Sequence, residues 1–176
     1  VSALVKGAFD HHVSLGGGPQ AWARGMNEDL RKAILPEQFA TAWVGRLDPA
    51  QDRLSFVVAG HCAPFRIVGG SEGGLRRSEV LRGKGLPLGL EADPDVQLQE
   101  TPLLVGDRLV LYTDGLVEVE RSDRSLLEQG GFRRICAELP ADLEAAADQA
   151  LAGARVGSGA ATFADDVTLV LLDRLA

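Results

Sequence analysis

Three aspartates stand at the ends of two apolar stretches that are far apart in the sequence. Asp114 follows the run LVLYT at 109–113. Asp165 and Asp166 come directly before the run VTLVLL at 167–172. If these stretches are neighbouring strands, Asp114 and Asp165 converge at one end of a sheet, and converging carboxylates repel one another unless a cation lies between them. Because oxygen-only ligands select hard ions such as Mg²⁺ or Mn²⁺, the pattern indicates a metal site.

The spacing alone leaves a simpler explanation open. Asp114-Gly115 is also an ordinary turn dipeptide, and an Asp-Asp pair before a strand often only faces solvent. Glu118 and Glu120 are close to Asp114 in the sequence, but they fit a solvated turn or short helix better than a metal shell.

Other reactive side chains do not form a recognisable site. His11 and His12 are adjacent, so on a helix they point about 100° apart and cannot bind one ion from one face. Cys62 and Cys136 lack a CxxC spacing and are predicted to be reduced thiols. No serine or threonine has a base at a recognisable spacing, and the glycine-rich runs lack the GK[ST] of a P-loop.

The elements that would position the aspartates are read from periodicity and turn residues. Helices are predicted at 1–13, 19–35, 126–139 and 142–154, and strands at 39–47, 53–59, 65–68, 75–81, 96–101, 108–113 and 167–172. The turn-rich DPAQD at 48–52 favours an antiparallel hairpin, and the glycines of GLPLGL at 85–90 indicate close backbone approach. Helices, an antiparallel meander, helices and a last strand predict an α/β or α+β domain of layered antiparallel sheets.

Composition sets broader limits. A chain of 176 residues with 45% apolar content and a mean hydropathy of +0.03 is predicted to be one globular domain over 1–176. Its 25 acidic and 18 basic residues give a net charge of −7, which disfavours nucleic acid as a partner. No apolar stretch is long enough to span a bilayer and no signal peptide is recognisable, so no membrane insertion and a cytoplasmic location are expected.

Four motifs resemble one known family. The segments LVLYTDGLVEV at 109–119, AGHCAPF at 59–65, GLPLGL at 85–90 and ADDVTLVLL at 164–172 are similar, in order and approximate spacing, to the SpoIIE/RsbU branch of the PPM-type metal-dependent serine/threonine phosphatases. The resemblance covers about 1–173. It implies two stacked antiparallel sheets flanked by helices and a two-metal centre holding Mn²⁺ or Mg²⁺, whose bridging water attacks a phosphoserine or phosphothreonine.

The resemblance also implies roles for individual residues. Asp114 and Asp165 would ligate one metal. Asp166 would orient a ligand or a metal-bound water, while Thr113 and Gly115 would shape the strand end.

His61, in AGHCAPF, is a further candidate for contact with the phosphate or a metal, although in the family this segment resembles a structural turn. The sequence departs from the family pattern upstream, because the GGD-type and GDxxGHG motifs that carry the remaining ligands are not in this chain. The first residues resemble the helix that follows GHG. Half an active site and an incomplete sandwich are therefore expected, and the isolated chain is expected to be inactive.

Two functions of different classes follow from the resemblance. The first is a phosphatase domain that dephosphorylates a small anti-anti-sigma (STAS) regulator in a partner-switching pathway and so releases a sigma factor. The second is a non-catalytic module that keeps the fold and binds such a regulator. The helices predicted within 1–35 carry more apolar surface than one sheet contact needs, which also predicts a homodimer through this region.

Overall fold

The computed structural model describes residues 2–69, 76–156 and 163–176. The chain forms two compact units. The first unit comprises Val1–Ala63 and Arg82–Leu103, and the second comprises Pro64–Leu81 and Leu104–Ala176. The elements are mixed helices and antiparallel strands, so the α+β prediction is confirmed.

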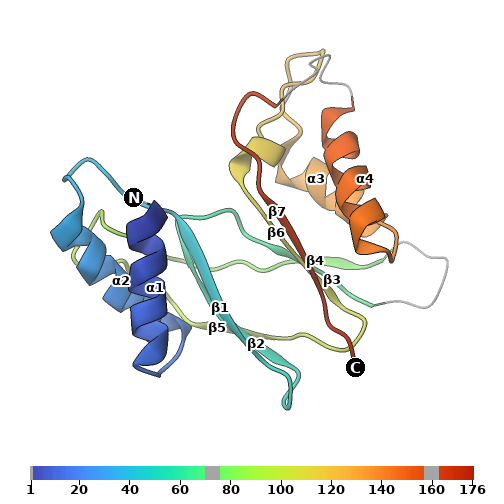
Figure 1. Ribbon diagram of the computed structural model, residues 1–176. Helices are drawn as coiled ribbons and strands as arrows, with labels where there is room; N and C mark the ends of the chain where they lie inside the picture. The colour runs from blue at the N-terminus through green and yellow to red at the C-terminus, as the bar shows by residue number, and fades with distance from the viewer. Residues whose placement is uncertain (1, 70–75, 157–162) are drawn as a thin grey trace. The chain divides into compact units, whose positions relative to one another are not determined.

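The first unit begins with two helices, α1 (Ser2–Ser14) and α2 (Pro19–Ala33). Gly16 and Gly17 have φ of +82° and +86°, a region that favours glycine, and Pro19 occupies the first turn of α2, where its missing N–H costs nothing. Both predicted helices are therefore confirmed, although α2 ends two residues before the predicted boundary. Figure 1 shows α1 beside α2, and α2 contacts β1 and β2 of the first unit.

A three-stranded sheet completes the first unit. Its strands are β1 (Ala42–Asp48), β2 (Arg53–Ala59) and β5 (Gln99–Pro102), in the order β1-β2-β5, and all pairs are antiparallel. The predicted hairpin is confirmed with Asp48 opposite Arg53. Apolar side chains from α2, the sheet and the segment that leads into β5 form the core of this unit: Trp22, Ala23, Met26, Leu30, Val44, Val57, Ala59, Leu88 and Val96.

The GLPLGL segment lies close to neighbouring backbone, as its glycines predict. A Cβ on Gly85 would lie 2.4 Å from the carbonyl oxygen of Val58, and Gly89 has a φ of +91°. The buried amide of Asn27 in α2 fixes the following turn, because it accepts from Gly89 N at 2.8 Å and donates to the carbonyl oxygen of Glu91 at 3.0 Å.

The second unit contains a four-stranded antiparallel sheet in the order β4-β3-β6-β7. Its strands are β3 (Phe65–Ile67), β4 (Ser78–Val80), β6 (Arg108–Tyr112) and β7 (Leu169–Asp173), and its helices are α3 (Glu128–Ala137) and α4 (Leu143–Arg155). Figure 1 shows α3 and α4 side by side, and they contact β3, β4 and β7. The rings of Phe65, Tyr112 and Phe132 pack with centroids 5.0 to 6.2 Å apart, which anchors α3 on the sheet.

Two strand predictions need correction. The predicted strand at 96–101 begins only at Gln99, because Val96 is 1% exposed and packs in the core of the first unit instead of pairing in the sheet. The meander is also divided, since β3 pairs with β4 and β6 and not with β2. The glycine-rich run VGGSEGG at 68–74, whose composition predicts a turn, lies largely outside the described residues. Within the described ranges, no helix combines the length and apolar character needed to cross a membrane.

Candidate metal centre

Asp114 stands at the tip of β6, where the strand gives way to one turn of 3-10 helix, η1 (Asp114–Leu116). The carbonyl oxygen of Asp114 accepts from Val117 N at 2.8 Å and from Glu118 N at 2.9 Å. Its side chain is exposed, and Oδ1 lies 3.1 Å from Gly115 N. The local backbone therefore fixes Asp114 and presents its carboxylate at the strand end.

Thr113 joins this strand end to the segment that begins β7. Its N–H donates to the carbonyl oxygen of Thr168 at 3.1 Å, and its Oγ1 accepts from Thr168 N at 2.8 Å. The same hydroxyl lies 3.2 Å from the carbonyl oxygen of Asp166, to which it donates. The two stretches that the sequence places more than fifty residues apart are thus neighbours, as the aspartate pattern predicts.

Gly115 makes the closest approach between the two segments. A Cβ at this position would lie 2.6 Å from the carbonyl oxygen of Asp166 and 3.2 Å from Cγ2 of Val167. Because real Cβ atoms do not come this close to backbone oxygen, only glycine fits without displacing one of the two segments.

Asp165 and Asp166 are both exposed, and Oδ1 of Asp165 accepts from Asp166 N at 2.7 Å. The carboxylate oxygens of Asp114 and Asp165 suit a hard divalent cation. Throughout the ranges that the structure describes, no group of three or more His, Cys, Asp or Glu side chains could hold an ion. The two strand ends therefore bring acidic segments together, and metal binding by Asp114 and Asp165 stays a prediction.

The other candidate ligands predicted or considered from the sequence, His61, Glu118 and Glu120, make different contacts. His61 belongs to the first unit, where its Nδ1 is 3.2 Å from Oγ1 of Thr41, and its predicted contact with phosphate or metal stays a prediction. Glu118 is exposed and follows η1, while Glu120 forms an isolated bridge with Leu126 in the next turn.

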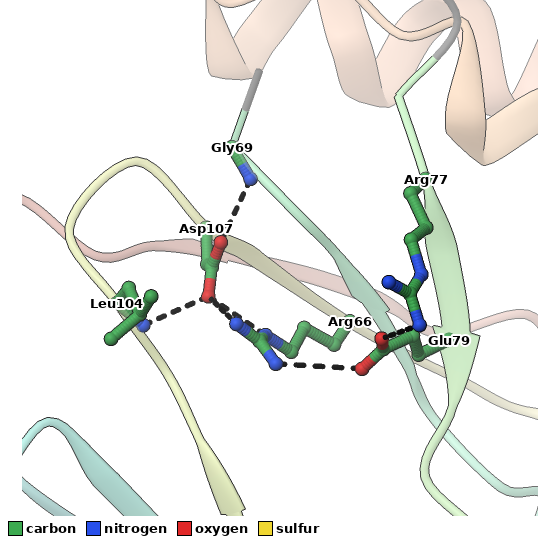
Figure 2. A network of polar contacts seen from close by, with 6 residues as sticks. All are labelled: Arg66, Gly69, Arg77, Glu79, Leu104 and Asp107. Carbon is green, nitrogen blue, oxygen red and sulfur yellow. Dashed lines mark hydrogen bonds and ion pairs between the residues drawn. The ribbon is translucent and has the colours of Figure 1, made fainter.

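Sequence reasoning missed a buried polar network in the second unit, which Figure 2 shows. Asp107, 1% exposed, accepts from Arg66 Nε at 2.7 Å and from the backbone N–H groups of Leu104 and Gly69, each at 2.8 Å. Arg66 also pairs with Glu79 across β3 and β4 at 3.4 Å. Charged residues at the start of an apolar strand, the GDR of 106–108, were the signal that could have found it.

A second buried ion pair joins the two strands that carry the aspartates. Arg108, directly opposite Asp173 in the β6–β7 ladder, donates through Nε to Oδ1 at 2.5 Å and through Nη2 to Oδ2 at 2.8 Å. Nη1 donates to the carbonyl oxygen of Pro140 at 2.8 Å, and Nη2 also donates to the carbonyl oxygen of Ala141 at 2.7 Å. The side chains of Arg108 and Asp173 are 2% and 21% exposed, so this bidentate pair is largely shielded from water.

Solved structures define the class of fold. The chain superposes on the SiaA-PP2C domain of Pseudomonas aeruginosa with a TM-score of 0.80 and 22% identity, covering 99% of this chain and 68% of that one. It also superposes on the catalytic domain of the serine/threonine protein phosphatase PstP, solved in complex with two manganese ions, with a TM-score of 0.67 and 19% identity, covering 99% and 80%. The fold is therefore that of PP2C-type phosphatase domains.

Sequence similarity identifies the family within that class. Residues 1–175 match the model of the family described as Stage II sporulation protein E (SpoIIE), and the chain belongs to this family. It is also 24% identical over 142 residues to phosphoserine phosphatase RsbU of Bacillus subtilis (strain 168), a match covering 77% of this chain. The chain spans about two fifths (39%) of that relative's length. The resemblance to the SpoIIE/RsbU branch is thus confirmed.

Proposed function

We propose that this chain forms part of a metal-dependent protein serine/threonine phosphatase that hydrolyses phosphoserine or phosphothreonine. The observation that carries the proposal is the contact between Thr113 to Gly115 and Asp166 to Thr168, because it brings two acidic strand ends together at one edge of the second unit. Membership of the SpoIIE family and the PP2C-type fold support the same activity.

In this proposal Asp114 and Asp165 bind one Mn²⁺ or Mg²⁺ ion of a two-metal centre. When bound, such ions lower the pKa of water and neutralise charge on phosphoryl oxygens. Asp166 orients a ligand beside them, and the Thr113 hydroxyl and Gly115 hold the two strand ends in contact. The manganese bound to PstP supports this choice of ion.

The chain's own ligands are too few for a two-metal centre. Two carboxylates rarely hold two cations in competition with water, and the described residues provide no group of three or more ligands. We therefore expect little or no turnover by the isolated chain. A segment carrying the GGD-type and GDxxGHG motifs would supply the remaining carboxylates.

The proposed substrate is a phosphorylated STAS-domain regulator of a partner-switching pathway. The resemblance to the SpoIIE/RsbU branch supports this choice, as does the similarity to phosphoserine phosphatase RsbU. A homodimer through residues 1–35 is part of the proposal, because α1 has no fully buried residue and Leu4 is 45% exposed.

A second candidate is a non-catalytic module that binds the regulator without turnover. The partial ligand set favours it. Replacement of Asp114 or Asp165 distinguishes the two functions. It should abolish turnover by a phosphatase, whereas a binding module should keep its affinity for the regulator.

Replacement of Asp114 tests the proposal. In a protein that contains this chain together with the two upstream motifs, a phosphoserine peptide should be hydrolysed in the presence of Mn²⁺ or Mg²⁺. Asp114→Asn should lower the rate by at least about a hundredfold, because it removes a ligand charge.

The matched control is Asp123→Asn. Asp123 is an exposed carboxylate nine residues further along, and it accepts from its own turn at Ser125. Its replacement should change turnover less than about twofold, as expected for a surface substitution away from the site. Unchanged turnover in Asp114→Asn would refute the metal-ligand role, and peptide binding without turnover by the unmodified protein would favour the binding module.

A further inference from the structure

We propose that the Arg108–Asp173 ion pair sets the register of β6 against β7 and thereby positions Asp114 beside Asp165 and Asp166. The register itself is a property of the chain, and only its importance for metal binding rests on the proposed function. Arg108 and Asp173 are positioning residues, since they lie at the opposite end of the ladder from Thr113 and Thr168.

The apolar pattern of β7 does not fix its register. In this strand, Leu169, Leu171 and Asp173 point to one face, while the more exposed Val170 and Leu172 point to the other. A one-residue slip would exchange the faces and is excluded by burial. A slip of two residues keeps every aliphatic side chain on its own face.

Such a slip would still pair apolar side chains across the ladder. Val110, now opposite Leu171, would face Leu169, which is equally aliphatic. Asp173 is the polar residue of β7, so its pairing with Arg108 distinguishes the native register from the slipped one. Displacement by two residues would place Arg108 opposite Leu171 and leave a buried guanidinium without its carboxylate, which is strongly unfavourable.

The same slip would remove the proposed site. Two residues of an antiparallel strand span about 6.8 Å, whereas an Mg²⁺–oxygen bond is about 2.1 Å long. Asp165 and Asp166 would move away from Asp114 by more than one ion can bridge, and Gly115 would no longer face the carbonyl oxygen of Asp166. A charge pair six residues before Asp114 and seven residues after Asp166 therefore controls whether the ligands meet.

The test replaces Asp173 and determines the β6–β7 register from interstrand NMR contacts. Asp173→Leu makes β7 aliphatic, and a second set of resonances should appear in which Val110 shows interstrand contacts to Leu169 instead of Leu171. Asp173→Asn, which preserves shape, should show the same effect with a smaller second population and serves if Asp173→Leu does not fold.

Glu79→Gln is the matched control. Glu79 and Arg66 are also directly opposite across two strands of the same sheet, but those strands carry none of the proposed ligands. In this variant Arg66 still donates a hydrogen bond to Asp107. The comparison is matched, because Arg108 likewise still donates to two backbone carbonyl oxygens when Asp173 is replaced. The Val110–Leu171 contacts should be unchanged in Glu79→Gln.

Titration with Mn²⁺ alone provides the second measurement. Broadening of the Gly115 and Asp166 amide signals should require about tenfold more Mn²⁺ in Asp173→Asn than in the unmodified chain or Glu79→Gln. If the unmodified chain shows no broadening at these residues, Asp114 and Asp165 do not bind Mn²⁺ without the upstream ligands, and the register measurement alone decides this inference. A single native register in both Asp173 variants would overturn it.

Discussion

At the scale of single residues, Gly115 shows how the site depends on the absence of a side chain. Its Cα faces the carbonyl oxygen of Asp166, an atom of the backbone that cannot rotate away. The adjacent aspartate can be read from the sequence as a candidate ligand, whereas this steric requirement depends on a contact with a segment far along the chain.

Gly115→Ala should destabilise the chain by about 1–3 kcal/mol, because the new methyl group would push apart the ends of β6 and β7. Urea unfolding measures the change. Gly130→Ala is the control, since a Cβ on Gly130 in α3 would meet nothing within 4 Å and alanine favours a helix by up to about 1 kcal/mol. Equal stability of Gly115→Ala and the unmodified chain would contradict the close approach.

Cys136 gives a prediction that depends on pH. Burial raises the pKa of this thiol to about 12 from its ordinary value of 9.0, against a smaller opposing effect of Arg108. The folded chain should therefore label slowly at Cys136 with a thiol reagent at pH 8, with a thiolate fraction about a thousandfold below that of an ordinary thiol.

The same shift has a consequence for stability. Because the folded pKa is raised, the thiol's contribution is fully present below about pH 9 and is lost as the pH rises toward 12. Mass spectrometry after labelling, with urea-unfolded protein as the control, checks the reactivity. Equal labelling rates at Cys136 in folded and unfolded protein would rule out the burial effect.

At the scale of elements, α2 fixes the turn after GLPLGL through one side chain. Asn27 is 1% exposed and bonds to the backbone of Gly89, Glu91 and Ala92. The helix could be predicted from its apolar spacing and from Pro19, but the partners of this asparagine lie more than sixty residues away and leave no local signal.

Asn27→Ala should lower the free energy of unfolding by about 2–3 kcal/mol, since it removes three hydrogen bonds that the buried Asn27 side chain makes to the backbone. Gln20→Ala is the comparison on the same helix, because Gln20 donates a single hydrogen bond to the carbonyl oxygen of Val96 at 2.9 Å. Its loss should cost about 1 kcal/mol or less. Similar effects of the two substitutions would show that Asn27 does not fix the turn.

Local patterns explain which elements could be predicted. The hairpin of β1 and β2 follows from the turn residues at 48–52, and the helix α4 follows from Asp142, whose Oδ1 accepts from Ala145 N at 2.8 Å. The late start of β5 and the division of the strands between two sheets depend on packing of Val96 and on pairing between distant strands. For the same reason, the aspartates could be found but the Arg108–Asp173 pair could not.

At the scale of the whole molecule, the structure narrows the surface available for the proposed homodimer. On α2, the apolar side chains of Trp22, Met26 and Leu30 are 7%, 2% and 1% exposed and belong to the core of their own unit. Leu4 is 45% exposed and Leu15 is 68% exposed, so these side chains are accessible to a second copy.

The chain should behave as a dimer in light scattering, and Leu4→Gln with Leu15→Gln should shift it toward monomer, because both substitutions place polar groups in the apolar contact. Leu175→Gln is the control, since Leu175 is 72% exposed and lies outside residues 1–35. A monomer at high concentration, or a dimer unaffected by the two substitutions, would count against this interface.

The interleaving of the two units along the chain determines when each can be completed during synthesis. The first unit needs β5, which ends at Pro102, so β3 and β4 of the second unit leave the ribosome before the first unit has all its strands. The second unit in turn waits for β7 near the end of the chain. No single cut gives two fragments that each contain a whole unit, because segments of the two units alternate along the chain, and each unit therefore forms only when its own two segments meet.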